Sequence, residues 1–309
     1  MYAILIGLIS SIFFSATFVV TKIMGVGGTN WAWTSSLRFL LALPFLFLIV
    51  LFRKEFKSTL KSIKENFWTW LIWGNLAGIG FYSLLSFSTE FAPSWLVAGS
   101  WQTTIIAGLL LSPLFTTIIK TKNGTKMVKG KIPVKRLIIS LSILFGVLLM
   151  QYAESSSMTL IELFNGFVPV VFAAFMYPLG NRKLMEKLGK DINSFQRSFG
   201  VAFVSIPLAL IFAIIGYNNS GGLSKESVMQ ALILAIFSGV IATVLFFFAT
   251  SKAQNNLSLL AGVEATQAGV VIFTIIGSMI FIGTSLPTGL SLVGIIIVIA
   301  GMILNSFVK

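Results

Sequence analysis

The sequence predicts an all-α integral membrane protein with ten transmembrane helices, arranged as two inverted five-helix repeats. The first observation is composition: the 309-residue chain is 56% hydrophobic and 10% charged, whereas soluble domains carry roughly 25% charged residues. The second is a series of ten apolar runs, each long enough to cross a bilayer as a helix. The third is a similarity between the two halves of the chain.

The ten apolar runs are expected to be helices because a backbone in lipid must satisfy its own hydrogen bonds. Residues that favour helix N-termini precede or open three of the runs, namely Asn30, Asn193 and Ser258. In chain order, the expected spans are 3–22, 31–52, 67–88, 94–119, 136–152, 163–181, 194–215, 228–251, 258–282 and 288–307.

The distribution of basic residues predicts the orientation of these spans. Eighteen of the 22 Lys and Arg residues fall in loops and tails on one side of a ten-span protein, and only Lys22 and Lys225 fall on the other. The positive-inside rule therefore places both termini in the cytoplasm and the protein in the cytoplasmic membrane. The net charge of +13 lies in short loops that meet anionic headgroups, so the lipid bilayer, and not nucleic acid, is the expected partner.

An internal repeat predicts how the helices are arranged. The segment LVAGSWQTT (96–104) matches LLAGVEATQ (259–267), and Arg38 matches Arg197 at a similar offset. We expect residues 1–155 to form the first repeat and 156–309 the second. Five spans per repeat is an odd number, so the second copy must enter the membrane upside down. Inverted repeats with a central substrate site are typical of secondary transporters.

Several kinds of chemistry are excluded by the residues present. The chain has no Cys and no His, which rules out thiolate metal sites, Ser–His nucleophile systems and histidine proton relays. It also lacks the GxxxxGK[ST] loop that binds nucleotide phosphates. The sequence therefore predicts neither an enzyme nor a bound metal or cofactor.

A resemblance to a known family rests on three features. These are the five-plus-five helix pattern, the segment SLRFLLA (36–42) early in the second span, and the spacing of Gly294 and Gly301 in the last span. With these features the chain resembles the drug/metabolite transporter superfamily, in its EamA-like branch, and more particularly bacterial multidrug resistance efflux transporters. The resemblance covers essentially the whole chain and implies the fold more firmly than the substrate.

Glu264 is the principal candidate site residue because it is a carboxylate deep inside an apolar run. It lies roughly 10 Å from the cytoplasmic end of its span, where a charge costs about 2.5–3.5 kcal/mol on insertion scales. It is expected either to exchange protons for a substrate or to form a structural ion pair or helix cap. The common EamA-like pattern has Pro after this Glu and a second Glu at the span's end, where this chain has Ala265 and Thr284.

Residues of both repeats are expected to join Glu264 in a substrate site. Trp101 and Gln102 occupy its place in the first repeat, so an aromatic face opposes a carboxylate and suits an aromatic cation. Thr266 and Gln267 can hydrogen-bond the same substrate.

Three more candidates lie in the first three spans. Phe14 and Tyr82 are expected to form walls of the site. Arg38 is expected to bind a substrate carboxylate, to pair with an acidic side chain, or to snorkel to the outer surface.

The predicted function is secondary-active export of small organic molecules by alternating access. The family resemblance favours drug-like cations as substrates and protons as coupling ions. Export of amino acids or other metabolites by the same fold is an alternative. Two others are a channel and an accessory membrane protein that has no flux of its own.

Overall fold

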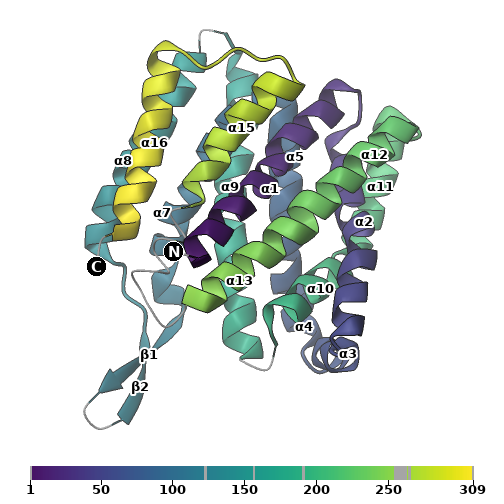
Figure 1. Ribbon diagram of the computed structural model, residues 1–309, viewed down its shortest axis with the longest axis vertical. Coiled ribbons are helices and arrows are strands. Elements are labelled where there is room, and N and C mark those ends of the chain that lie inside the picture. Colours follow the sequence, from purple (N-terminus) through teal and green to yellow (C-terminus); the bar gives the residue numbers. More distant parts are fainter. Residues whose placement is uncertain are drawn as a thin grey trace.

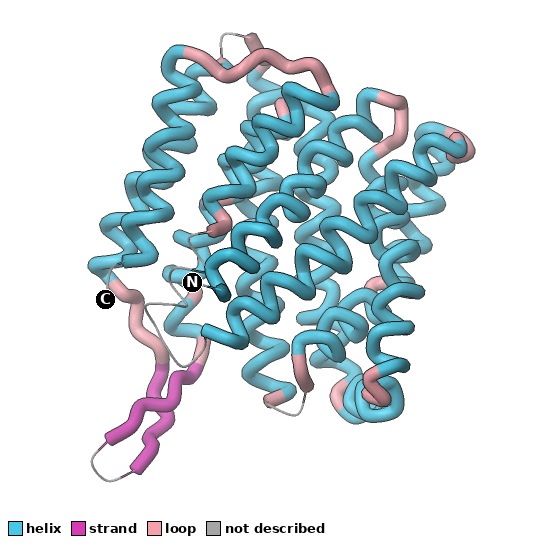
Figure 2. The backbone as a smooth tube through the Cα atoms, in the orientation of Figure 1, coloured by secondary structure: helices cyan, strands magenta, loops and turns pink. Residues whose placement is uncertain are grey.

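The computed structural model describes residues 2–121, 124–155, 157–189, 192–253, 263 and 266–307. Almost all of these residues are helical, which confirms the predicted class (Figures 1 and 2). One antiparallel pair of strands projects from an end of the bundle, where Thr116 pairs with Lys129 and Thr121 with Gly124.

The first half of the chain forms helices in each of its five predicted ranges. The third of these contains two stretches of π-helix, η1 and η2. The elements are α1 (Tyr2–Val26), α2 (Trp31–Phe52), α3 (Phe56–Glu65), α4 (Phe67–Thr69), η1 (Trp70–Gly74), η2 (Leu76–Gly80), α5 (Phe81–Phe91), α6 (Ser94–Trp101), α7 (Thr103–Leu110), η3 (Ser112–Leu114), β1 (Thr116–Thr121), β2 (Gly124–Lys129) and α8 (Val134–Glu154).

The second half of the chain is also helical, with a third π-helical stretch in η4. Its elements are α9 (Leu160–Leu188), α10 (Ser194–Val204), α11 (Ile206–Ser220), α12 (Lys225–Leu234), η4 (Ala235–Ala242), α13 (Thr243–Ala253), α15 (Ala268–Phe281) and α16 (Gly289–Phe307).

Two of the predicted helix starts are confirmed by side-chain caps. The Asn30 side chain accepts a hydrogen bond from the backbone N–H of Ala32. Asn193 accepts bonds from the N–H groups of Phe195 and Gln196. Both contacts satisfy donors that a helix N-terminus would otherwise leave unpaired. Ser258, the third predicted start, lies outside the described residues.

One predicted range is wrong at its C-terminal end. The α-helical part of 94–119 ends at Leu110, the 3-10 helix η3 follows, and Thr116–Thr121 is a strand instead. Pro113 has no backbone N–H with which to continue an α-helix, and the β-branched run TTIIKT that follows favours a strand. An apolar run alone could not distinguish these two conformations.

Not every helix is long enough to cross a bilayer by itself. In the described chain, six helices are long and apolar enough, and a seventh follows if α10 and α11, bent by 46° at Ser205, are counted as one. The helices α6 and α7 have eight residues each, and α15 has 14. The structure therefore gives a multi-helix membrane protein, and ten crossings remain a prediction.

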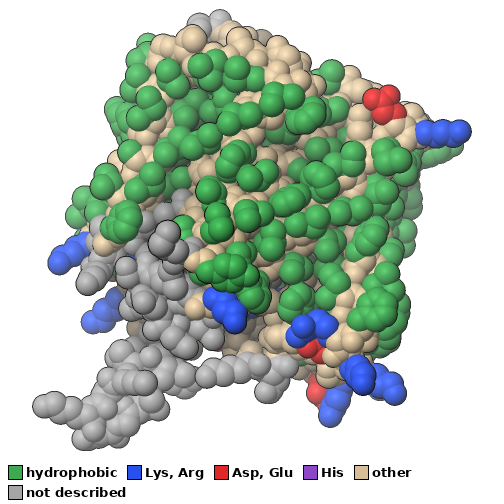
Figure 3. Space-filling view, in the orientation of Figure 1, with side chains coloured by type: hydrophobic (Ala, Val, Ile, Leu, Met, Phe, Trp, Pro, Cys, Tyr) green, Lys and Arg blue, Asp and Glu red, His purple; other side chains and the backbone are tan. Residues whose placement is uncertain are grey.

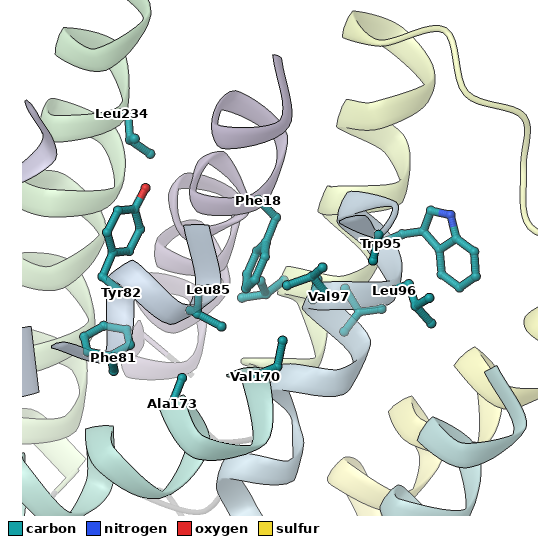
Figure 4. Close-up of a cluster of buried hydrophobic side chains, with 14 of the residues drawn as sticks. Phe18, Phe81, Tyr82, Leu85, Trp95, Leu96, Val97, Val170, Ala173 and Leu234 are labelled. Carbon is teal, nitrogen blue, oxygen red and sulfur yellow. The ribbon is translucent and has the colours of Figure 1, made fainter. Parts of the chain in front are cut away.

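Helix packing brings the two halves of the chain together. Helix α1 packs against η4, α13 and α15, while α2 packs against α10 and α11, and α8 packs along α16 (Figure 1). Buried side chains of the core, including Phe18, Tyr82 and Leu85, meet between these helices (Figure 4). The core is thus shared by both halves.

The surface of the protein has an apolar band and a basic end (Figure 3). Hydrophobic side chains cover most of the visible face, and Lys and Arg side chains gather at its lower end (Figure 3). That end carries α3 and the strands, and both chain termini lie toward it (Figure 1). Such an arrangement fits a protein whose middle lies in hydrocarbon.

Candidate functional site

A cavity of about 350 Å³ lies inside the helix bundle. Its walls come from α1, α2, α5, α6, α7, α8, α9, α13, α15 and α16, which include helices of both halves of the chain. Its volume falls at the lower end of the roughly 300–1,000 Å³ typical of ligand pockets. The cavity is therefore the candidate binding site.

The structure brings six of the eight predicted site residues to this cavity. All six line the cavity wall, although they come from five separate parts of the sequence. They are Phe14, Arg38, Tyr82, Trp101, Gln102 and Gln267.

The other two predicted residues are Thr266 and Glu264. Thr266 does not line the cavity: its hydroxyl donates to the Val263 carbonyl over 2.6 Å. A Cβ added at Gly7 would also lie 2.6 Å from the Thr266 hydroxyl oxygen, so this side chain packs against α1. Glu264 lies outside the described residues.

Arg38 is buried at the cavity wall, with 8% of its surface exposed. One guanidinium nitrogen donates to the Ser238 hydroxyl over 3.2 Å. The guanidinium carbon lies 4.1 Å from the Tyr82 ring centre and 5.3 Å from that of Phe39, within range of a cation–π contact. Of the three roles predicted for Arg38, snorkelling to the outer surface is therefore not the one that the structure shows.

Tyr82 is held in place under Arg38 by a second contact. Its hydroxyl and that of Thr21 lie 2.9 Å apart and share a hydrogen bond. The Tyr82 side chain is fully buried, so the hydroxyl needs this partner. The ring face remains available to the guanidinium.

Three aromatic rings form a cluster on the cavity wall. Phe81 and Trp101 stack with centroids 5.5 Å apart and an interplanar angle of 25°. The centroid of the Tyr177 ring lies 4.7 Å from that of Phe81 and 5.7 Å from that of Trp101. The cluster offers a planar ligand both ring faces and ring edges, which is the geometry that aromatic groups prefer.

A smaller cavity of about 90 Å³ shares Phe14, Arg38, Phe81 and Tyr177 with the first. Arg197 also lines it. The two arginines that match in the internal repeat therefore face one cavity from opposite halves of the chain.

Sequence reasoning missed five polar residues that line the main cavity: Thr17, Thr104, Asn305, Arg136 and Arg182. Arg136 and Arg182 were assigned to loops that set the topology. Arg182 instead reaches α7, where one nitrogen donates to the Gly108 carbonyl over 2.6 Å. Thr104 matches Gln267 when LVAGSWQTT is aligned with LLAGVEATQ, so the internal repeat was the available signal.

The site is suited to binding a small organic molecule. No group of three or more His, Cys, Asp or Glu side chains is placed to hold a metal ion anywhere in the described ranges. The lining combines aromatic faces, hydroxyl and amide groups, and guanidinium groups. Such groups recognise ligands by stacking, hydrogen bonding and charge.

Comparison with known proteins gives a match along the whole chain. The family model described as "EmrE: Putative multidrug resistance efflux transporter" matches residues 1–309. "Uncharacterized protein YjlA" of Bacillus subtilis (strain 168) is 41% identical over 307 residues, covering 99% of this chain and 95% of that protein. A protein of Shouchella clausii, "Uncharacterized 42.1 kDa protein in intracellular alkaline protease 3'region", is 39% identical over 269 residues, covering 87% of this chain and 70% of its own.

A solved structure supports the fold. Its title is "Crystal structure of protein", and it superposes with a TM-score of 0.61 over 95% of this chain and 94% of its own. The two sequences are 14% identical, so this likeness concerns the fold alone.

Proposed function

The chain belongs to the multidrug resistance efflux transporter family, and from this membership we propose that it is a secondary-active transporter that exports small organic molecules across the cytoplasmic membrane by alternating access. The observation that carries the proposal is the cavity of about 350 Å³ between the two halves of the chain. A central site shared by two halves is what a rocking mechanism requires.

Two inverted five-helix repeats, 1–155 and 156–309, are part of this proposal. Packing supports them, because two contacts between the halves recur with the halves exchanged: α5 packs on α9 as α13 packs on α1, and α7 packs on α9 as α15 packs on α1. The π-helical stretches η2 and η4 begin at Leu76 and Ala235, the same offset that separates Arg38 from Arg197.

The proposed orientation places the basic end and both termini in the cytoplasm. The clustering of Lys and Arg side chains at the end that carries α3 supports it (Figure 3). Because the chain contains no cysteine, single cysteines give a clean test. Lys57→Cys should react with an impermeant maleimide only from the cytoplasmic side, and Lys225→Cys only from the outside. The reverse pattern would refute this orientation.

Glu264 is proposed to couple transport to protons. The support is its place in the sequence, opposite Trp101 and Gln102 of the first repeat, both of which line the cavity. Drug-like cations are the substrate class that family membership favours. The buried guanidinium of Arg38 favours the alternative, a metabolite or amino acid that carries a carboxylate.

Flux into proteoliposomes tests the proposal. With an imposed pH gradient, we expect saturable accumulation of ethidium or of 2-naphthoate above that of protein-free liposomes. Glu264→Gln should abolish gradient-driven accumulation, and Glu226→Gln, at an exposed residue bonded to Gln230, should not. Flux that never saturates and follows conductance would identify a channel. Absence of flux for both probes would refute the transporter.

A further inference from the structure

We propose that the cavity binds an amphipathic organic carboxylate, with the carboxylate on Arg38 and an aromatic body against Phe81, Trp101 and Tyr177. This inference rests on the proposed function in treating the cavity as the substrate site. It goes further by naming the substrate's charge and shape, and it differs from the cationic class that the family name suggests.

The first support is the charge of the cavity wall. Arg38, Arg136 and Arg182 line the main cavity, and Arg197 lines the smaller one that adjoins it. No Asp or Glu of the described chain lines either cavity. Guanidinium groups in the wall of a cavity favour an anionic ligand over a cationic one.

The described carboxylates are engaged elsewhere. Each accepts a hydrogen bond from a residue outside the main cavity or forms an ion pair with one. The seven are Glu55, Glu65, Glu90, Glu154, Glu162, Glu186 and Glu226. In the part of the chain that the structure covers, no carboxylate lies within 4.0 Å of Arg38.

Arg38 also retains unused hydrogen-bonding capacity. Its Nε is buried and has no hydrogen-bond partner among the described residues, and one Nη is bonded to the neutral Ser238 hydroxyl. A buried guanidinium without a carboxylate partner is costly. A substrate carboxylate would supply both the missing charge and a planar pair of acceptors that match the guanidinium fork.

Three other residues of the cavity wall also carry buried polar atoms without a described partner. The Thr104 hydroxyl, the Gln267 side-chain NH₂ and the Asn305 side-chain oxygen are buried without a partner in the described structure, and all three residues line the main cavity. Buried polar groups are normally hydrogen-bonded. Two of these groups can donate to substrate oxygens, which extends the preference for an oxygen-rich head group.

The aromatic cluster accounts for the rest of the ligand. The stacked Phe81 and Trp101 rings, with the edge of Tyr177 beside them, present an apolar wall to a planar group. The wall and Arg38 belong to one cavity of about 350 Å³. A single-ring or two-ring aromatic carboxylate therefore has the required combination of a charged head and a flat body.

Three probes with one ring system test the proposal: 2-naphthoate, 2-naphthamide and 2-naphthylmethylammonium, titrated calorimetrically into the purified wild-type protein at pH 7.5. We expect 2-naphthoate to bind at least about tenfold more tightly than the neutral amide, and the ammonium to bind more weakly than both. This comparison needs no variant, so it does not depend on the folding of one. Tightest binding of the ammonium, or equal binding of all three, would overturn the proposal.

Variants then locate the charge preference. Arg38→Gln should erase the advantage of the carboxylate over the amide, Arg38→Lys should retain part of it, and Arg53→Gln, at the partly exposed end of α2, should leave it unchanged. Naphthoate binding that survives in a folded Arg38→Gln protein would overturn the assignment to Arg38. If naphthoate binds as expected but is not accumulated in proteoliposomes, the transport function fails and the carboxylate site stands.

Discussion

The Arg38 guanidinium lies 4.1 Å from the ring centre of Tyr82, and the hydroxyl of that ring shares a hydrogen bond with Thr21 on α1. Three helices, α1, α2 and α5, are therefore linked through one tyrosine. The link holds the Arg38 guanidinium in place in the cavity wall, because a shift of the Tyr82 ring would break its hydrogen bond to Thr21.

Replacing Tyr82 by Phe should lower the free energy of unfolding by about 1 kcal/mol, since it leaves the Thr21 hydroxyl without its partner. Thr21→Val alone should cost a similar amount. The double variant should cost less than the sum, because both ends of the bond are then removed together. Unfolding of the four proteins in mixed detergent micelles measures the cycle, and strictly additive losses would contradict the link.

Shortening Trp101 should weaken binding of an aromatic ligand more than it affects folding. Trp101→Ala removes the ring that stacks on Phe81, and we expect about a tenfold loss of affinity for 2-naphthoate, as for other aromatic contacts worth roughly 0.5–1.5 kcal/mol. Trp101→Phe should recover most of it. Trp68→Ala, at an exposed ring of α4 that does not line the cavity, serves as the control, and an equal loss in both alanine variants would argue against the cluster as a binding wall.

Sequence reasoning predicted much of this site because its strongest signals were polar residues in apolar runs. Arg38 was singled out for that reason, and it lines the cavity. Trp101 and Gln102 were added because the repeat places them opposite Glu264, and Gln267 because it lies close to Glu264 in the sequence; all three line the cavity. The two segments that the predicted repeat aligns, 96–104 and 259–267, contribute Trp101 and Gln267 to one cavity.

The residues that were missed lack such a signal. Arg182 lies near the end of α9, where a basic residue is normally a topology determinant, and only the packing of α9 on α7 turns it toward Gly108. Thr266 was predicted to join the site but does not line the cavity, for a similar reason. Its hydroxyl satisfies a local backbone carbonyl, which is common for Thr in helices and invisible in a sequence pattern.

Lys22 is predicted to hold one end of the bundle closed. Its ammonium donates to the carbonyls of Thr89 over 2.7 Å and Ala92 over 3.1 Å, which joins α1 to the end of α5. Lys22→Met removes these charge-assisted bonds. With a single cysteine at Thr17, which lines the main cavity, we expect maleimide added from the Lys22 end of the bundle to react about tenfold faster. Lys225→Met, at an exposed residue that begins α12, should leave the rate unchanged. Equal rates in all three proteins would show that Lys22 does not control access.

The crossing of α8 and α16 should be among the least tolerant packing contacts in the protein. A Cβ added at Gly146 would lie 2.8 Å from the Gly294 carbonyl oxygen and 2.9 Å from Val298, and one added at Gly301 would lie 2.8 Å from Ile143. In lipid, close packing of small residues replaces the hydrophobic effect as the force between helices. Gly146→Ala should therefore lower the free energy of unfolding by about 1–3 kcal/mol, the usual cost of overpacking.

Gly222→Ala provides the matched comparison, because nothing lies within 4 Å of a Cβ at that position, and a change below about 0.5 kcal/mol is expected there. Unfolding in mixed micelles compares the two variants with the wild type. The prediction also gives a physical reason for the spacing of Gly294 and Gly301: the seven-residue interval keeps both on the face of α16 that meets α8. If Gly146→Ala unfolds at the wild-type midpoint, the two helices can separate without loss, and the glycine spacing must serve some purpose other than packing.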